Sequence, residues 1–458
     1  MPRIVHLGLG AFHRAHQAVY LQRLHDSGDR AWTLASGNIR PDGNETVAAL
    51  QAQGGRYTLE TVDADGSRAY DSIDAIAQVL PWDESLSAFI AAGADAQTRI
   101  ISFTVTEAGY ALQPDDRLDT AAPDICSDLA LLREGRAGST LYGALVAMLR
   151  ARIAAQAGPV TLLCCDNLRH NGERSRKGLL QFIEAAGDMQ LLRWVQENTS
   201  SPNAMVDRIT PRPTPEVAAR VLQATGRRDG AAVMSERFIQ WVIEDRFIAG
   251  RPAWESVGIE MVADVDPYEE AKIRLLNATH SCVAWAGALA GCAFVHEAVA
   301  NARIRQFAID YANHDAIPAL SPSPIDLHRY HQTVVERFSN AVLMDTTQRI
   351  LADSYAKLAT FVAPTVADRL ARAQSLDAVA MLPALYLACL LKWRRGQLPF
   401  DYEDKALDEA TAAALCDGPD PVLALCSDTR LWGACAGAPE LLAALRPAWQ
   451  RVAGFGPT

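Results

Sequence analysis

The beginning of the chain carries the feature that most constrains its fold, an apolar run that ends at two closely spaced glycines. The run covers residues 3–9, and the glycines are Gly8 and Gly10. Residues 15–24 follow, with apolar side chains at helical spacing. A strand, a glycine turn and a helix in this order are typical of the first repeat of an α/β sheet with parallel strands.

Later segments first extend this pattern and then replace it. Buried-strand character recurs in the segments 32–36, 100–105 and 160–165. From about residue 269 the apolar spacing is helical, in the segments 269–290, 304–313, 329–338, 347–358, 365–373 and 378–392. We therefore predict a doubly wound α/β domain over residues 1–250 and a mostly α-helical domain over residues 251–458. The change of pattern lies near residues 235–265.

Composition narrows the classes of protein that fit. Among the 458 residues, 49% are hydrophobic and 21% are charged, which is typical of a globular chain. Since 54 acidic residues outnumber 43 basic ones, we expect no nucleic-acid partner. The apolar stretches are too short to span a bilayer, so we expect no membrane partner.

The nine cysteines and the early first strand indicate in which cellular compartment the protein is expected. No two cysteines have CxxC spacing, so we expect free thiols in a reducing compartment. A strand-like run begins almost at once, and we expect no secretory signal peptide. The expectation is a cytoplasmic protein. The sequence leaves a monomer and a small homo-oligomer open.

The glycine turn has the context of a dinucleotide-binding site, between a strand and a helix. Gly8 permits the tight turn, and Gly10 lets the backbone approach a pyrophosphate. The N-terminus of the helix offers unpaired N–H groups to the phosphates. His13 stands where the fingerprint has its third glycine, so a plain turn remains an alternative. The strands that follow favour the cofactor.

The end of the second predicted strand is expected to contact the adenosine ribose. Asn38 is placed there to bond a ribose hydroxyl, Asp42 favours NAD, and Arg40 would accept the 2′-phosphate of NADP. We predict NAD. The candidate cofactor residues are Gly8, Gly10, Phe12, Asn38, Asp42, Thr106 and Glu107, the last two following the strand at 100–105.

Four polar residues share one face of a predicted helix at the start of the helical half. At about 100° per residue, an arc of about 140° contains Glu269, Lys272, Asn277 and His280. A desolvated lysine can accept the proton of an alcohol, and amide or imidazole groups can hold the alcohol oxygen. The segment therefore predicts oxidation of a secondary alcohol by hydride transfer to a nicotinamide, without a metal. The alternative is a solvated face on which Glu269 and Lys272 pair at i, i+3.

Two loops hold further candidates. Asn167 follows the buried strand at 160–165, where ligands bind in open α/β sheets, and is placed to stabilise a developing alkoxide. The alternative is a turn rich in Asp and Asn. Asp207 lies in a compact polar loop that could contribute to the site. The His-x-x-His pairs that begin at His13 and His328 lack further ligands nearby, so we predict no metal site.

Several longer segments resemble the mannitol dehydrogenase family of polyol-specific long-chain dehydrogenases. They are GLGAFHRAHQ at 8–17, TVTEAGY at 104–110, CDNLRHNG at 165–172, MVDRITPRPT at 205–214 and YEEAKIRLLNATHS at 268–281. The resemblance extends over nearly the whole chain, and the last segment is the most specific. It implies a Rossmann-type N-terminal domain, a mostly helical C-terminal domain, and a metal-independent, NAD-linked reaction on a polyol or its ketose.

The resemblance also implies roles for single residues. Lys272 would be the general acid/base, and His280 would lie beside the substrate. The further implied roles are polarisation of the substrate oxygen by Asn167 and Asn277, a proton gate at Glu269 and a substrate contact at Asp207.

Family members often carry the motif R-x-x-H-D-G-x-x-K later in the chain. Arg349 and Lys357 match this motif and are expected to contact the substrate, whereas Ala352 and Ser354 replace its His and Gly. The replacements fall among expected hydroxyl-binding positions, and they favour a polyol other than mannitol. Mannitol itself, a uronate paired with Arg349, and a nucleotide-binding sensor without catalysis stay open as alternatives.

Overall fold

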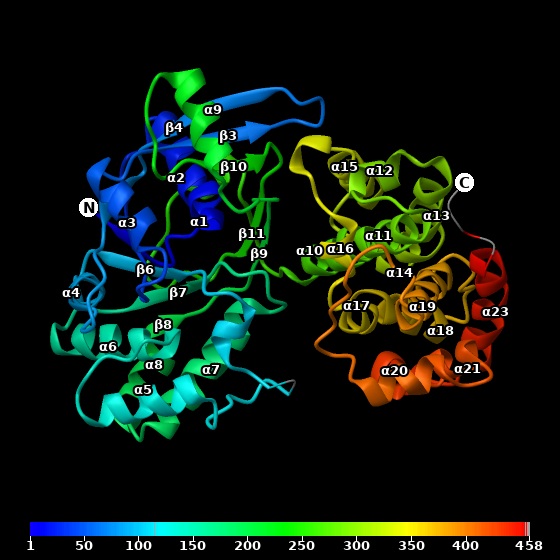
Figure 1. Cartoon of the computed structure of the whole chain (residues 1–458). Coiled ribbons are helices and arrows are strands. Elements are labelled where there is room, and N and C mark those ends of the chain that lie inside the picture. Colours follow the sequence, from blue (N-terminus) through cyan, green and yellow to red (C-terminus); the bar gives the residue numbers. More distant parts are fainter. Residues whose placement is uncertain (114, 454, 456–458) are drawn as a thin grey trace. The chain divides into compact units, whose positions relative to one another are not determined.

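The computed structural model of the chain describes residues 1–113, 115–453 and 455, and it divides into two compact units (Figure 1). The first unit comprises Met1–Val62 and Arg68–Asp266, and the second comprises Asp63–Ser67 and Pro267–Thr458. The observed division therefore follows Asp266, whereas the sequence pattern placed it at residue 250.

The first unit is built on a sheet of six parallel strands in the order β5-β2-β1-β6-β7-β8. The strands are β1 (Arg3–Leu7), β2 (Thr33–Gly37), β5 (Ile76–Val79), β6 (Thr98–Phe103), β7 (Val160–Cys164) and β8 (Thr199–Ser200). The chain runs outward from β1 through β2 to β5 and then returns to β6 on the other side of β1. The predicted doubly wound sheet is confirmed. Its strand order reverses at the carboxyl ends of β1 and β6, where such sheets bind ligands.

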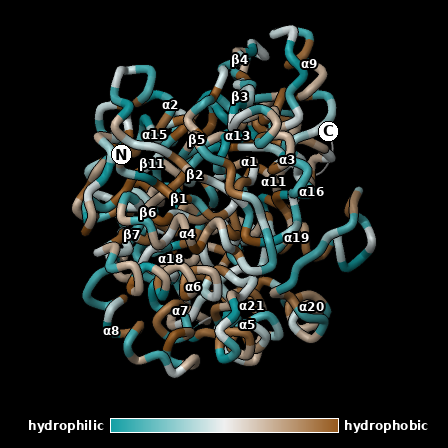
Figure 2. Tube along the Cα trace, turned by 90° about the vertical axis from the view of Figure 1, so that its left-hand side faces the viewer, coloured by the Kyte–Doolittle hydropathy of each residue, from teal (hydrophilic) through white to brown (hydrophobic). Residues whose placement is uncertain are grey.

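Side chains of the central strands alternate between two hydrophobic cores. Ile4 and Ile100 lie in one core, and Val5 and Ile101 lie in the other. The helices over the first core are α2 (Gln17–Asp26) and α3 (Asn44–Ala52), and those over the second are α4 (Ser87–Ala94), α6 (Leu141–Ala154) and α7 (Asn171–Ala185). Because both faces are buried, the strands are almost continuously apolar, which is why the sequence predicted them. Figure 2 shows hydrophilic stretches mostly in the outer loops.

Two small sheets of the first unit were not predicted. They have the orders β10-β3-β4 and β12-β11-β9 and consist of β3 (Tyr57–Val62), β4 (Arg68–Ile73), β9 (Ala204–Asp207), β10 (Val233–Glu236), β11 (Gln240–Glu244) and β12 (Glu260–Val262). Strand β3 carries Glu60, a fully buried carboxylate that pairs with Arg68 at 2.6 Å and with Arg220 at 2.8 Å. A charge inside the strand interrupts the apolar pattern, and only the tertiary partners make its burial tolerable.

The second unit is mostly helical, as predicted. Helix α11 (Ala278–Ala290) is buried on all sides over residues 282–289 and packs against α12, α13, α16 and α19. The other main helices are α10 (Asp266–Ala271), α12 (Val295–Ala300), α13 (Ala302–Tyr311), α15 (Leu327–Phe338), α16 (Thr347–Leu351), α17 (Ser354–Lys357), α18 (Ala363–Ala371), α19 (Met381–Arg394), α20 (Glu409–Cys416), α21 (Pro421–Cys426) and α23 (Pro439–Ala453). Within the described chain, no helix has both the length and the apolar character needed to cross a membrane.

Two predicted helices of this unit are interrupted. A π-helical turn at Lys272–Asn277 separates α10 from α11. The prediction of one regular helix over 269–290 is therefore wrong. The helix expected over 347–358 breaks at Asp353, whose backbone is left-handed with φ 56°. Left-handed backbone cannot continue a right-handed helix, and two short helices result.

A buried pair of histidines lies beneath the glycine turn of the first unit. The rings of His6 on β1 and His13 on α1 (Ala11–Ala15) stack with their centroids 3.6 Å apart. His6 Nδ1 lies 2.8 Å from Ser102 Oγ on β6, and His13 Nε2 lies 3.0 Å from Ser36 Oγ on β2. Burial lowers the pKa of His6 to about 3 and holds the pKa of His13 well below its ordinary value. The pair therefore joins three strands and a helix, and His13, which stands in place of the third glycine, is a neutral ring within it.

We predict that acid destabilises the first unit through these histidines. Their lowered pKa values mean that the unfolded chain binds these protons more readily than the folded one. Their contribution to stability is fully present above pH 6.5 and is lost as the pH falls from 6.5 towards about 3. The loss is about 1.4 kcal/mol per pH unit for each histidine, and urea unfolding at pH 7 and pH 5 measures it.

The matched variants are His13→Gln and, at an exposed position, His328→Gln. The slope of the free energy of unfolding against pH gives the number of protons that the chain takes up on unfolding. His13→Gln should reduce this number by about one, and His328→Gln should leave it unchanged. A slope in His13→Gln equal to that of the unsubstituted protein would contradict the assignment.

Candidate active site

The glycine turn after β1 has one closed side and one open side. Gly8 has φ 113°, and a Cβ on it would lie 2.2 Å from the carbonyl oxygen of Thr104, so only glycine fits there. Gly10 precedes the first residue of α1 with φ −76°. Apart from Gly10 itself and its two chain neighbours, no heavy atom of the described chain lies within 4 Å of the position of a Cβ on Gly10. The turn is therefore packed against β6 at Gly8 and open over Gly10, as a backbone that approaches a pyrophosphate requires.

The residues around this turn are tied to it by hydrogen bonds. Asn38, directly after β2, accepts from the Leu9 N–H at 2.6 Å and donates to the Asp42 carbonyl at 3.1 Å. The Asp42 side chain is exposed, and Phe12 stacks on His16 at 4.9 Å. Asn38 therefore shapes the turn, and its contact with a ribose stays a prediction.

Arg40 and the histidine pairs have other contacts. Arg40 forms an exposed ion pair with Asp124 at 3.2 Å. His16 Nε2 lies 2.9 Å from the Gln240 carbonyl oxygen, and burial lowers the pKa of His331 to about 4. The rings of His13, His16 and His331 are buried, whereas His328 is exposed.

The loop after β6 is held by Asp166, a residue that the sequence analysis did not select. Its carboxylate accepts from the Val105 N–H at 2.9 Å, from the Thr106 N–H at 3.0 Å and from the Tyr110 hydroxyl at 2.5 Å. Burial raises the pKa of Asp166, although the three hydrogen bonds favour its ionised form. These bonds hold Thr106 at φ 70°, an unusual backbone for a β-branched residue, and Glu107 follows it.

A second buried residue, Asn171, supports the loops that carry Asn167 and Asp207. Its side chain accepts from the Ala204 N–H at 2.8 Å and donates to the carbonyls of Ala204, Asp166 and Cys164. Asn167 is exposed at the end of β7, and Asp207 is buried at the end of β9. In the sequence, both supporting residues are polar and follow soon after an apolar strand, and this pattern is the signal that could have identified them.

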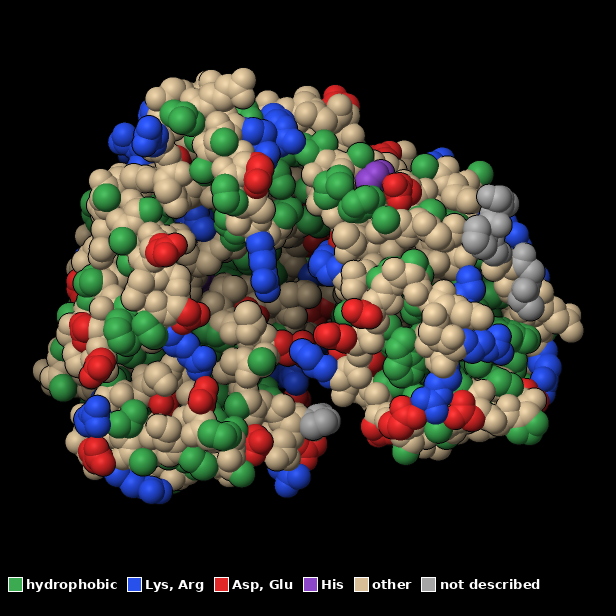
Figure 3. Space-filling model, viewed as in Figure 1, with side chains coloured by type: hydrophobic (Ala, Val, Ile, Leu, Met, Phe, Trp, Pro, Cys, Tyr) green, Lys and Arg blue, Asp and Glu red, His purple; other side chains and the backbone are tan. Residues whose placement is uncertain are grey.

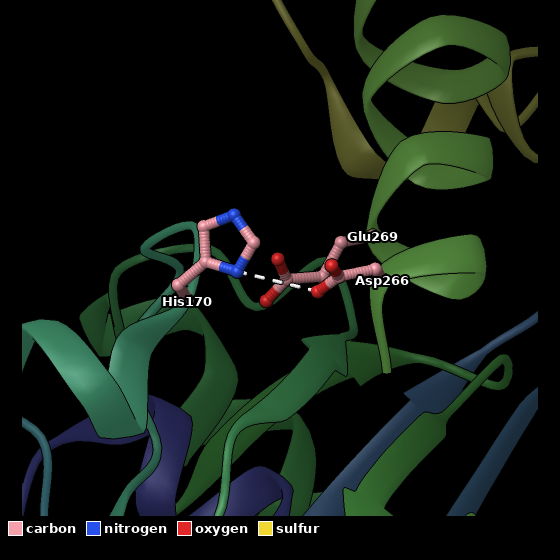
Figure 4. A group of neighbouring side chains, drawn as sticks. All are labelled: His170, Asp266 and Glu269. Carbon is pink, nitrogen blue, oxygen red and sulfur yellow. Dashed lines mark ion pairs between the residues drawn. The ribbon is translucent and has the colours of Figure 1, made fainter. Parts of the chain in front are cut away.

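Charged side chains are also present at the start of α10. His170 Nδ1 lies 3.2 Å from Asp266 Oδ1, and Figure 4 shows this pair together with Glu269, one turn further along α10. Acidic and basic side chains are interspersed over the face drawn in Figure 3.

The π turn decides how the catalytic candidates of the second unit are arranged. Lys272 begins this turn and Asn277 ends it, five residues apart. A π turn closes i→i+5 hydrogen bonds and holds more residues per turn than an α-helix. A regular helix would have rotated Asn277 by about 140° from Lys272. The π turn therefore brings Asn277 closer to the line of Lys272 than a regular helix would.

Glu269 and His280 extend this row by one turn at each end, at spacings of three residues. Glu269 is 5% exposed and Lys272 is 7% exposed, whereas Asn277 and His280 are half-buried. The solvated helix face considered as an alternative would have left these side chains in water. All four candidates thus share one side of a largely buried helix.

His280 has two contacts that the sequence did not predict. Its ring stacks on Phe338 at 4.4 Å, and its Nε2 lies 3.2 Å from Asp345 Oδ2. Oδ1 of the same carboxylate accepts from Arg349, 2.7 Å from its terminal nitrogen and 2.8 Å from Nε. Burial lowers the pKa of His280, and Asp345 opposes that shift. The spacing of Asp345 and Arg349 at i, i+4 was the available signal.

In the segment that matches the family motif, the polar groups of Lys357 and Ser354 are bonded within the second unit. Lys357 Nζ donates to the carbonyls of Ile350 and Ala352 at 2.7 and 2.6 Å, and burial lowers its pKa to about 8. Ser354 is buried, accepts from Trp285 Nε1 at 2.8 Å and donates to the Leu351 carbonyl. The expectation that this replacement lies at a hydroxyl-binding position is wrong for Ser354, because its hydroxyl is bonded within the core.

Comparisons with known proteins agree with this architecture over both units. Residues 2–256 match the family model described as the mannitol dehydrogenase Rossmann domain, and residues 264–453 match the mannitol dehydrogenase C-terminal domain. The chain belongs to the mannitol dehydrogenase family. The predicted family is thereby confirmed, and with it the predicted class of enzyme, an NAD-linked polyol dehydrogenase.

Several members of the family are similar over nearly their whole length. The D-arabinitol 4-dehydrogenase of Ralstonia nicotianae is 54% identical over 98% of this chain and 96% of its own length. The D-arabinitol 4-dehydrogenase of Klebsiella pneumoniae is 46% identical over 96% of each chain. Among solved structures, a substrate-free D-sorbitol dehydrogenase has a TM-score of 0.89 at 30% identity, covering 99% of this chain and 94% of its own. The Pseudomonas fluorescens mannitol 2-dehydrogenase, in a ternary complex with NAD and D-mannitol, has a TM-score of 0.81 at 32% identity, covering 99% and 92%.

We predict that Gly10→Ala weakens dinucleotide binding without destabilising the fold. The added methyl group meets open space in the chain itself and has an allowed backbone, but it occupies the side from which a pyrophosphate would approach. The dissociation constant for NADH, measured by fluorescence titration, should rise at least about tenfold, while thermal stability changes by no more than about 0.5 kcal/mol.

Gly8→Ala is the contrasting variant. Its methyl group would meet the Thr104 carbonyl, so this substitution should lower thermal stability as well as binding. NADH binding by Gly10→Ala as tight as that of the unsubstituted protein would place the pyrophosphate elsewhere.

Proposed function

We propose that the chain oxidises D-arabinitol to D-xylulose with NAD⁺, reversibly and without a metal ion, and that Lys272 is the general acid/base. The observation that carries this proposal is the row formed by Lys272, Asn277 and His280 along the π turn and α11. The two D-arabinitol 4-dehydrogenases at 54% and 46% identity support the choice of polyol.

The proposed chemistry is a balanced transfer of one proton and one hydride. NAD⁺, when bound at the glycine turn, would supply the acceptor for the hydride that leaves the carbinol carbon. The neutral amine of Lys272 takes the hydroxyl proton as the C–O bond gains double-bond character. The Asn277 amide donates a hydrogen bond to the same oxygen and stabilises the charge that develops on it. In the reverse direction, the lysine ammonium returns the proton to the forming alcohol.

The remaining candidates have supporting roles in this proposal. Asn167 would be a second donor to the substrate oxygen, and Glu269, one turn before Lys272, would pass its proton to solvent. The proposed substrate contacts are His280, Asp207, Arg349 and Lys357, and the proposed cofactor contacts are Gly8, Gly10, Phe12, Asn38, Asp42, Thr106 and Glu107. We place the protein in the cytoplasm, where its nine thiols would stay reduced.

Two rival substrates fit the site less well. A uronate needs a cation for its carboxylate, but the charge of Arg349 is offset by Asp345 at 2.7 Å. Mannitol would meet Ala352 where family members often have a histidine, and an alanine methyl group cannot bind a hydroxyl. Both observations favour a shorter, uncharged polyol.

We predict that Lys272→Ala abolishes most of the turnover while NADH still binds. Loss of a general base should lower kcat for arabinitol oxidation by about 10²–10⁴-fold. The unsubstituted enzyme should oxidise faster as the pH rises, because the acceptor must be deprotonated, and this dependence should disappear in the variant. The control is Lys405→Ala at an exposed position of the same unit, which should keep full activity. Full turnover by Lys272→Ala would refute the assigned role.

We predict a substrate order in which D-arabinitol is preferred. NAD⁺ reduction measured with D-arabinitol, D-mannitol and xylitol should give the highest kcat/KM for D-arabinitol, and NADP⁺ should replace NAD⁺ poorly. NADH oxidation with fructuronate tests the uronate alternative. Faster turnover of the uronate than of D-xylulose would overturn the proposed substrate.

A further inference from the structure

The carboxylate of Asp345 connects two of the proposed substrate contacts in the second unit. Its Oδ2 lies 3.2 Å from His280 Nε2, and its Oδ1 lies 2.7 Å from Arg349. Only 12% of the Asp345 side chain is exposed. Burial opposes the ionisation of Asp345, yet the neighbouring His280 ring and the charge of Arg349 together lower its pKa. The group is therefore an ionised carboxylate, held between a ring and a guanidinium.

The backbone that carries this carboxylate is fixed on both sides. The Asp345 carbonyl accepts from the Val295 N–H at 2.9 Å, and Thr346 forms an isolated antiparallel bridge with Phe294. The Thr347 N–H then donates to the Ala293 carbonyl at 3.0 Å. Helix α16 begins at Thr347 and packs on α11. The backbone bonds of residues 345–347 therefore fix the carboxylate relative to α11, the helix that carries His280.

The position of the carboxylate decides where the histidine holds its proton. A neutral imidazole has one N–H donor and one bare acceptor nitrogen. An anionic oxygen beside Nε2 attracts an N–H there and repels a lone pair, so the tautomer with Nε2–H is favoured. The Phe338 ring stacks on the face of His280 and so opposes a rotation of the ring that would exchange its two nitrogens.

We propose that Asp345 is a positioning residue that holds the proton of His280 on Nε2 and leaves Nδ1 to accept a hydrogen bond from a substrate hydroxyl. This proposal rests on the proposed role of His280 as a substrate contact. It gives His280 the role of an acceptor, complementary to the amide donor of Asn277 three residues earlier. A polyol hydroxyl can donate to such an acceptor, whereas an ether or an ionised carboxylate cannot.

The direct test is the tautomer of His280, read from ¹⁵N NMR of histidine-labelled protein. The ring signals are assigned by their loss in His280→Asn, since the chain has ten histidines. The expected result is a protonated Nε2 and a bare Nδ1 in the unsubstituted protein, and a shift towards the other tautomer in Asp345→Asn. A protonated Nδ1 in the unsubstituted protein would overturn the proposal, and so would an unchanged ring in Asp345→Asn.

The kinetic test is a double-mutant cycle. Asp345→Asn should raise KM for D-arabinitol about tenfold, with NADH affinity unchanged, because the change of tautomer removes the hydrogen bond from the substrate hydroxyl to Nδ1 of His280. The effect should vanish when His280→Asn is already present, because coupled residues are not additive. If the effect instead vanishes only in the background of Arg349→Gln, the carboxylate acts through the arginine and the proposal fails.

Two further comparisons separate this proposal from the proposed function. Asp401→Asn, at an exposed position of the same unit, should change neither KM nor the His280 signals. If His280→Asn leaves polyol kinetics intact, the proposed contact of His280 with substrate is wrong, and the assignment of an acceptor role falls with it. The NMR result then still decides whether Asp345 sets the tautomer.

Discussion

The i→i+5 turn at Lys272–Asn277 is the constraint on which the candidate site depends. Such turns are rare within helices and occur frequently at functional sites. This one packs against two further π turns of the same unit, at Ala312–Ala316 and Leu358–Val362, and continues into the buried helix α11. The surrounding packing thus holds a backbone that the local sequence would not choose, and it narrows the arc over which the polar groups lie on one side of the helix.

Buried polar side chains have a comparable role in the first unit. His13 occupies the position of a glycine and joins α1 to β2 through Ser36, and Asp166 holds the loop after β6 by three hydrogen bonds. Each group is buried, and its hydrogen bonds offset part of the cost of its desolvation. The open surface over Gly10 is therefore supported from below by polar contacts that leave the turn itself uncovered.

In the second unit, buried side chains likewise hold His280 in place. The ring is fixed by Phe338 on its face and by Asp345 at Nε2, and Asp345 is fixed by its own backbone. Meanwhile Ser354 and Lys357, which the family motif placed near the substrate, have their polar groups bonded within the unit. The motif thus includes residues whose polar groups are bonded within the unit, and spacing alone does not identify them.

The sequence by itself determined the parallel sheet, the helical second half and the turn at Gly8 and Gly10, because these depend on local periodicity and on backbone freedom. It also grouped Glu269, Lys272, Asn277 and His280 on one helix face, although on the wrong helical geometry. It could not show the strand that contains Glu60, the break at Asp353, or the contacts of Asp166 and Asp345. Those features were decided by the tertiary structure, since a buried charge, a left-handed residue and a π turn are each unfavourable alone and persist only where distant residues compensate them.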